Sequence, residues 1–183
     1  MKNRAILVAC LLACMHLSAS SQVYLTRNGT IRFFSEAPLE NIEALNRQVM
    51  SALNTETGEF VFRLPMRSFA FDKALMQEHF NDNFVESHKY PNATFQGVME
   101  GIGDIDFDRP GEISVVVEGE LTIKDVSKNI RESGTLHIHE DHLHASAEFI
   151  IAPEDYNIRI PTRYARNIAR EIEVFVDVNL RPQ

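Results

Sequence analysis

Apolar and polar residues alternate along several stretches of this chain, a period of two that is typical of strands with one buried face. The clearest stretch is residues 113–123, ISVVVEGELTI, where the odd positions are apolar and the even positions mostly polar. Residues 172–180, IEVFVDVNL, alternate in the same way near the end of the chain. Shorter runs predict further strands at residues 23–25, 31–34, 39–44, 49–53, 60–64, 93–97, 136–139, 142–151 and 158–160.

Turn motifs between these runs predict antiparallel connections through short loops. We expect Arg27-Asn28-Gly29-Thr30 to close a first hairpin, residues 46–48 to separate two strands, and residues 124–129 to form a turn. About eight short strands in this order predict a mostly β fold, either a sandwich or a closed up-and-down barrel. A barrel of this size is filled by side chains or holds one small ligand.

The period changes once, inside the most aromatic stretch of the chain, residues 60–97. Leu75, Met76, Phe80 and Phe84 recur at helical spacing, which predicts one helix inserted between strands. We expect Asp72 to cap its N-terminus, because a carboxylate can accept hydrogen bonds from the first free N–H groups. A brief second helix is expected at residues 164–169.

The first residues have the pattern of a secretory signal rather than of a folded element. Lys2 and Arg4 precede a short apolar run, and Ser18-Ala19-Ser20 offers small residues for cleavage. We therefore expect residues 1–21 to be a signal peptide, residues 22–183 to form one domain, and the protein to be periplasmic or secreted. Cys14 in Leu11-Leu12-Ala13-Cys14 also fits a lipoprotein box, which we regard as the less favoured reading. Since Cys10 and Cys14 are the two cysteines, the processed chain would have no thiol.

The charge of the chain argues against polyanionic partners. The formal net charge is −8, and removing the signal removes two further positive charges. A net negative surface repels nucleic acid and anionic membrane surfaces. We expect no nucleic-acid partner and no integral membrane segment in the processed chain. The sequence leaves open whether the protein forms a homodimer.

Several motifs in the middle of the chain resemble the signature of the YceI-like family. They are Leu75-Met76-Gln77-Glu78-His79-Phe80-Asn81, Glu86-Ser87, Lys89-Tyr90-Pro91, Phe95 with Gly97, Gly119-Glu120-Leu121-Thr122-Ile123 and Asp155-Tyr156-Asn157-Ile158. The resemblance extends from Val23 to Pro182, with one departure at Asp125, where the family usually has glycine. It implies an exported, eight-stranded antiparallel lipocalin-like barrel with one inserted helix and a short C-terminal helical turn. It also implies binding of an amphiphilic lipid, a polyisoprenoid or isoprenoid quinone, with no enzymatic activity and no other cofactor.

A pocket for an isoprenoid tail needs apolar walls with few polar groups. The candidate ligand-binding residues are Phe33, Phe62, Leu64, Phe69, Phe71, Met76, His79, Phe80, Phe84, Phe95, Val115, Val117 and Phe149. The alternative for each apolar residue is that it only fills the core. For His79 the hypothesis is contact with the head group of a quinone or phosphate at the pocket mouth, and the alternative is packing at the helix edge.

A second candidate site is the histidine-rich stretch at residues 137–144. If Glu140-Asp141 form a two-residue turn, His137, His139, His142 and His144 lie on one face of a hairpin. Four imidazoles are suitable ligands for Zn²⁺, Ni²⁺ or Cu²⁺. The apolar positions between them take the buried side, so the imidazoles face water, and we interpret them as a solvated surface. We therefore assign no metal ligand and no catalytic residue, and keep a metal-binding protein or metal-assisted enzyme as the alternative function.

Overall fold

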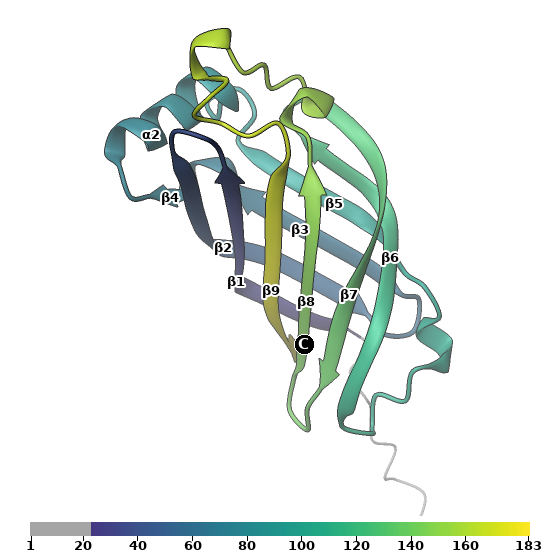
Figure 1. Ribbon diagram of the computed structural model, residues 1–183. Coiled ribbons are helices and arrows are strands. Elements are labelled where there is room, and N and C mark those ends of the chain that lie inside the picture. The colour runs from purple at the N-terminus through teal and green to yellow at the C-terminus, as the bar shows by residue number, and fades with distance from the viewer. Residues whose placement is uncertain (1–22) are drawn as a thin grey trace, which may run out of the picture.

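The computed structural model describes residues 23–183, whose eight long strands close into one antiparallel barrel (Figure 1). The strands are β1 (Val23–Glu36), β2 (Asn41–Asn54), β3 (Glu59–Pro65), β5 (Asn92–Met99), β6 (Gly111–Ile123), β7 (Val126–Ile138), β8 (Leu143–Ile151) and β9 (Ile172–Pro182). They follow the order β1-β9-β8-β7-β6-β5-β3-β2, and pairing of β1 with β2 closes the ring. The predicted barrel is confirmed, whereas the predicted signal lies outside the described residues.

The remaining elements are short and lie in the connections between strands. The two-residue strand β4 (Ala70–Phe71) pairs with β2. Helix α2 (Ala74–His79) continues directly into the π-helical turn η2 (Phe80–Phe84), and together they are the inserted helix. The 3-10 turns are η1 (Met66–Ser68), η3 (Ile102–Asp104), η4 (Pro153–Tyr156) and η5 (Thr162–Tyr164). Among the described residues no helix combines the length and the apolar character that a membrane span requires.

The expected hairpin turn at residues 27–30 is wrong. β1 runs without reversal through Asn28 and Gly29, and its pairing register with β2 shifts on both sides of Gly29. Asn28 and Gly29 therefore form a β-bulge instead of a turn, because β1 is paired with β2 on one side and with β9 on the other. A Cβ atom on Gly29 would come 2.5 Å from Cγ1 of Val178, so the glycine allows the close approach of β9.

The expected break at residues 46–48 is also wrong, because β2 is one continuous strand. Asn46 lies opposite Ile31 beside the same bulge and is completely buried. Its Nδ2 donates to the carbonyl oxygen of Pro65 at 2.8 Å, and its Oδ1 accepts from the N–H of Gln48 at 2.9 Å. The polar run is thus an internal irregularity whose hydrogen bonds are satisfied.

Four further local expectations differ from the structure. Residues 158–160 form no strand, and the brief helix expected at residues 164–169 is instead the 3-10 turn η5. The residue that caps α2 is Lys73, and no side chain hydrogen-bonds to the helix N-terminus, so the cap assigned to Asp72 is wrong. The turn after β6 is only Lys124-Asp125, since Ile123 pairs with Val126. Lys124 takes the left-handed conformation (φ 58°) that this tight reversal requires.

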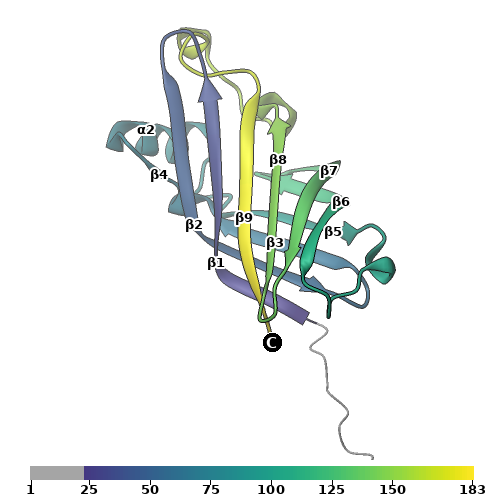
Figure 2. The same ribbon diagram turned by 60° about the horizontal axis from the view of Figure 1, so that its bottom comes forward.

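The alternation of strands gives the barrel two distinct ends (Figures 1 and 2). We call one the open end; it consists of the connections at residues 37–40, 66–91, 124–125 and 152–171. We call the other the closed end; it consists of the connections at residues 55–58, 100–110 and 139–142. Toward the closed end the interior is packed with completely buried aliphatic residues: Leu53, Leu136, Leu143, Val178 and Leu180.

Candidate ligand-binding site

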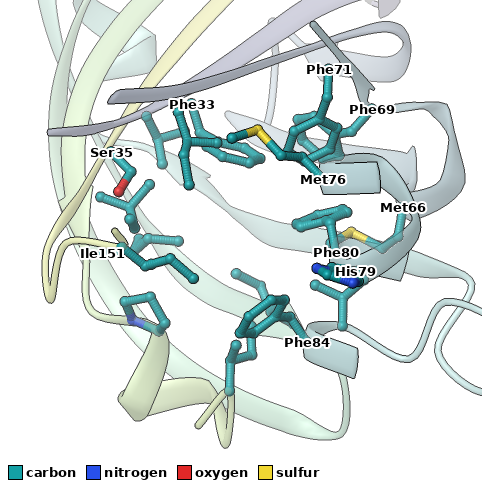
Figure 3. A pocket seen from close by; sticks show the side chains of 18 of the residues that line it. Phe33, Ser35, Met66, Phe69, Phe71, Met76, His79, Phe80, Phe84 and Ile151 are labelled. Carbon is teal, nitrogen blue, oxygen red and sulfur yellow. The ribbon is translucent and has the colours of Figure 1, made fainter. Parts of the chain in front are cut away.

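The open half of the barrel contains a cavity of about 500 Å³ (Figure 3). Every strand except β7 supplies part of its wall, and α2, η2 and the β8–β9 connection lie across its mouth. In Figure 3, Ile151 of β8 lies on the opposite side of the cavity from Met76 and Phe80 of the helical segment. The volume lies within the range of about 300–1,000 Å³ that is usual for small-molecule sites.

Phe80 anchors the aromatic side of the cavity. Its ring centroid lies 5.1 Å from that of Phe71 and 5.6 Å from those of Phe33 and Phe69. These tilted and edge-on contacts between three segments of the chain are the arrangements that aromatic rings prefer. The cluster is therefore a fixed wall that joins β1, the β3–β4 segment and the helix.

The π-helical turn decides which side chains of the helix point inward. The N–H of Val85 donates to the carbonyl of Phe80 at 2.9 Å, five residues back, which inserts one extra residue into the turn. Phe80 and Phe84 both line the cavity as a result, and Val85 is almost completely buried behind them. Leu75, near the start of α2, borders the cavity but remains largely exposed.

A salt-bridge network fastens the end of this helical segment to the β6–β7 turn. The Lys124 side chain is only 9% exposed, and its Nζ lies 2.9 Å from Glu86 Oε1 and 3.3 Å from the carbonyl oxygen of Phe84. Lys89 donates to the other carboxylate oxygen of Glu86 at 2.6 Å. Hydrogen bonds from Lys89 and Lys124 lower the pKa of Glu86 to about 2. This network holds Phe84 at the edge of the cavity.

Polar groups are few and occur at the mouth. Ser35 Oγ accepts a hydrogen bond from the N–H of Ala169 at 2.9 Å, so it is already engaged. Lys73 Nζ donates to Glu40, which links the helix to the β1–β2 hairpin across the mouth and lowers the pKa of the Glu40 carboxyl. The rings of His79 and Tyr164 lie 6.2 Å apart at the same end. The interior offers apolar surface, and the polar contacts available to a ligand lie at its entrance.

Nine of the candidate residues line the cavity: Phe33, Leu64, Phe69, Phe71, Met76, His79, Phe80, Phe84 and Phe149. Phe62, Phe95, Val115 and Val117 belong to the barrel core but not to the cavity wall. Phe62 instead packs against Phe60 and Phe95, with ring centroids 4.6 and 6.3 Å apart. Alternation along a strand predicts which residues point inward, but it does not predict how far along the barrel the cavity extends.

Comparison with known proteins agrees with this architecture. A family model described as the YceI-like domain matches residues 20–180. The chain belongs to the YceI-like family. Comparison with curated proteins finds no significant match.

Solved structures share the fold at low sequence identity. A polyisoprenoid-binding domain from Saccharophagus degradans, implicated in plant cell wall breakdown, has a TM-score of 0.77 at 13% identity, covering 90% of this chain and 100% of its own. BcnA from Burkholderia cenocepacia has a TM-score of 0.65 at 15% identity, covering 83% and 95%. A Campylobacter jejuni YCEI protein has a TM-score of 0.55 at 16% identity, covering 74% and 81%.

The cavity of this YceI-like barrel also includes residues that were not among the candidates. They are mainly aliphatic and include Ile31, Ala93, Leu121, Ile123, Ile151, Ile158, Ile168, Ile172 and Val174. Leu121 and Ile123 continue the alternating run that contains Val115 and Val117, so the pattern itself marked them as inward-facing. They differ from most of the candidates in having no aromatic ring.

The histidine hairpin has the predicted arrangement. His137 pairs with His144, and the N–H of His139 donates to the carbonyl of His142 at 2.9 Å. The rings of His139 and His142 stack with centroids 4.2 Å apart and planes 8° apart. In residues 23–183 no three histidine, cysteine or carboxylate side chains are grouped so that they could hold a metal ion. His142 and His144 instead contact Asp141 at 2.7 Å and Asp177 at 3.0 Å.

Proposed function

We propose that this YceI-like protein is an exported binding protein that holds an amphiphilic isoprenoid-like lipid, a polyisoprenoid or quinone, in the cavity of its open end. The observation that carries the proposal is a hollow whose walls are apolar while its polar groups lie at the mouth. A lipid with an apolar tail and a polar head has the same division. The polyisoprenoid-binding domain of similar fold supports the choice of an isoprenoid.

Burial of the tail supplies the affinity in this proposal. A tail that hides about 400 Å² gains about 10 kcal/mol from burial, before the costs of ordering it and of association. The rigid rings around Phe80 reduce the cost on the protein side, because they are already packed in place. At the mouth, His79 and Tyr164 lie beside the expected position of the head group.

The proposal is for binding without catalysis, in the compartment that the signal predicts. Residues 1–21 direct export and are removed, and the remaining chain diffuses in the periplasm or outside the cell. Its surface histidine hairpin has no part in ligand binding, since residues 137–144 do not line the cavity.

The direct test is to extract the purified protein with organic solvent and identify the released lipid by mass spectrometry. We expect an isoprenoid lipid in near-stoichiometric amount. Ala93→Phe is the test variant, because Ala93 is almost completely buried and lines the cavity, so the larger ring occupies ligand volume. It should retain about tenfold less lipid, a difference that corresponds to about 1.4 kcal/mol of binding free energy.

Ala70→Phe is the matched control, because Ala70 is exposed on β4 outside the cavity. It should retain lipid like the unchanged protein. Adding lipid back to stripped protein should raise Tm, with a stabilisation of about 2.7 kcal/mol at a free ligand concentration of one hundred Kd. Protein that carries no isoprenoid lipid, or an Ala93→Phe variant that keeps it fully, would contradict the proposal.

A further inference from the structure

One part of the connection between β8 and β9 is strongly basic although the chain as a whole is acidic. Residues 159–170, RIPTRYARNIAR, contain four arginines and no carboxylate, in a chain of formal net charge −8. All four side chains, Arg159, Arg163, Arg166 and Arg170, are exposed. Within the described chain, none of them forms an ion pair. Four unpaired guanidinium groups on one loop leave a positive surface that the protein itself does not neutralise.

The basic loop lies at the open end, and the opposite end is acidic. The closed-end connections at residues 55–58, 100–110 and 139–142 together hold seven carboxylates and one arginine. The open-end connections hold nine carboxylates and eight lysines and arginines, so they are close to neutral overall, and the positive charge at this end is concentrated in residues 159–170. At physiological ionic strength charges interact over about 8 Å, so the field beside residues 159–170 is set by their own arginines and not by the carboxylates of the closed end.

Apolar side chains project into solvent at this same end. Leu39, at the tip of the β1–β2 hairpin, is 58% exposed, and Leu75 of α2 is 61% exposed. The tip and the basic loop form one rim, because the N–H of Leu39 donates to the carbonyl of Arg166 at 3.0 Å. Figure 2 shows the β1–β2 tip and the β8–β9 connection side by side at the end of the barrel.

The rim is continuous with the cavity mouth. Tyr164, Asn167 and Ile168 of the basic loop line the cavity. The guanidinium carbon of Arg163 lies 4.8 Å from the centre of the Tyr164 ring, and that ring lies 6.2 Å from Phe84. An aromatic ring between a cation and an apolar interior is the arrangement that proteins use at the interface of a bilayer.

We propose that this rim docks on an anionic phospholipid bilayer, so that the lipid ligand passes between the membrane and the cavity without crossing water. The arginines contact the anionic head groups, Leu39 and Leu75 enter the interfacial region, and the mouth opens onto the membrane. Among the open-end carboxylates, Glu40 pairs with Lys73, and Glu86 pairs with Lys89 and Lys124. Glu36 and Glu171 flank the basic loop, and Asp72, Glu78 and Asp82 are exposed on or beside the helical segment that carries Leu75. The passage of ligand rests on the proposed function, but docking itself is measured without ligand.

The first experiment measures binding of the chain from residue 22 onward to vesicles with about 30% phosphatidylglycerol, and to vesicles of phosphatidylcholine alone, by co-sedimentation. We expect binding to the anionic vesicles that weakens when NaCl rises from about 0.1 M to about 0.5 M. Replacing Arg159, Arg163, Arg166 and Arg170 by glutamine should lower the partition coefficient about tenfold or more, since each arginine contributes to the attraction. The matched control replaces Arg27, Arg47, Arg63 and Arg109, which are exposed elsewhere, and changes the net charge equally.

The second experiment shows which surface touches the membrane. The chain contains no tryptophan, so a Leu39→Trp variant has a single tryptophan at the rim. Its fluorescence should shift to the blue when anionic vesicles are added. Val98→Trp, at a 49% exposed position on β5, should show no shift.

Each outcome decides between the alternatives. Equal loss of binding in the two quadruple variants, or a shift of Val98→Trp without a shift of Leu39→Trp, would overturn docking through the rim. Tight binding of soluble inorganic diphosphate that needs the rim arginines, without vesicle binding, would assign them to an anionic head group instead. Vesicle binding by a protein that carries no isoprenoid lipid would leave docking established and reject the proposed ligand.

Discussion

Asn46 shows how a single polar residue can be required inside an apolar barrel. A buried donor or acceptor that loses its partner costs about 1–3 kcal/mol, whereas a satisfied one contributes modestly to stability. Asn46 donates a hydrogen bond to the carbonyl of Pro65 in the neighbouring strand and accepts one from the N–H of Gln48 in its own strand. Its side chain therefore satisfies two backbone groups beside the irregular pairing of β1 and β2.

Asn46→Ala should lower the free energy of unfolding by about 2–4 kcal/mol, because it leaves both the Pro65 carbonyl and the Gln48 N–H without a partner. Urea unfolding followed by circular dichroism measures this difference. Asn129→Ala, at an exposed position on β7, is the control and should change stability little. A loss no larger at Asn46 than at Asn129 would show that the bulge does not depend on the amide.

At the scale of the element, the helical segment is held over the cavity by its two ends. At the first end, Gln77 Oε1 accepts from the N–H of Phe71, which ties α2 to β4. At the second end, Glu86 joins Lys124 and Lys89. The helix has no side-chain cap of its own, so these tertiary contacts position it. Helices this short are marginal alone and depend on packing.

The Glu86 network predicts a specific dependence of stability on pH. Because the pKa of Glu86 is lowered to about 2 in the fold, its ionised form stabilises the protein above about pH 4.5. That stabilisation is lost as pH falls toward about 2. Glu86→Gln should reduce stability at pH 6 and should flatten the decline of stability between pH values of about 5 and about 2, as measured by thermal melting.

Glu56→Gln, in the exposed turn before β3, is the control and should leave that decline unchanged. If Glu86→Gln and the unchanged protein lose stability in parallel over this range, the network does not contribute to acid stability. Lipid should be removed before these measurements, so that ligand loss at low pH is not mistaken for protonation of Glu86.

At the scale of the whole molecule, the barrel is filled at one end and hollow at the other. Leu136 is completely buried in the filled half, and Leu121 lines the cavity in the hollow half. Removing a packed side chain creates a new void, whereas shortening a cavity wall only enlarges a void that already exists. The two halves should therefore respond differently to the same substitution.

Leu136→Ala should cost about 3–5 kcal/mol of unfolding free energy, and Leu121→Ala about 1–2 kcal/mol. Denaturant unfolding of lipid-free protein measures both. Lipid retention should show the opposite order. Leu121→Ala should weaken retention, and Leu136→Ala should leave it intact. Equal destabilisation by the two substitutions would mean that the hollow half closes around its own side chains.

Most of the architecture follows from local patterns. The alternation at residues 113–123 and 172–180 placed strands that the structure contains, and the helical spacing of Met76, Phe80 and Phe84 placed the inserted helix. The pattern was misleading at Asn28-Gly29 and at residues 46–48, where turn-forming residues lie in a bulge between paired strands. A bulge and a turn use the same residue types, and only the pairing partners on either side distinguish them.

The candidate site was likewise predicted only in part from local patterns. Periodicity identified inward-facing residues, and nine of the candidates line one cavity. Periodicity could not separate Leu64 from Phe62, which lies two residues earlier on the same strand and packs against Phe60 and Phe95. Their difference is a position along the barrel axis, which depends on how eight strands are staggered and on where the helix crosses the end.

The sequence by itself thus determined a β-rich barrel, its inserted helix, its family and the inward faces of its strands, because each depends on the spacing of residues within one segment. Only the tertiary structure decided that the barrel is hollow at one end. It also decided that four arginines distant from β1 share a rim with Leu39 and the cavity mouth. Both results depend on contacts between segments far apart in the chain, which local spacing does not encode.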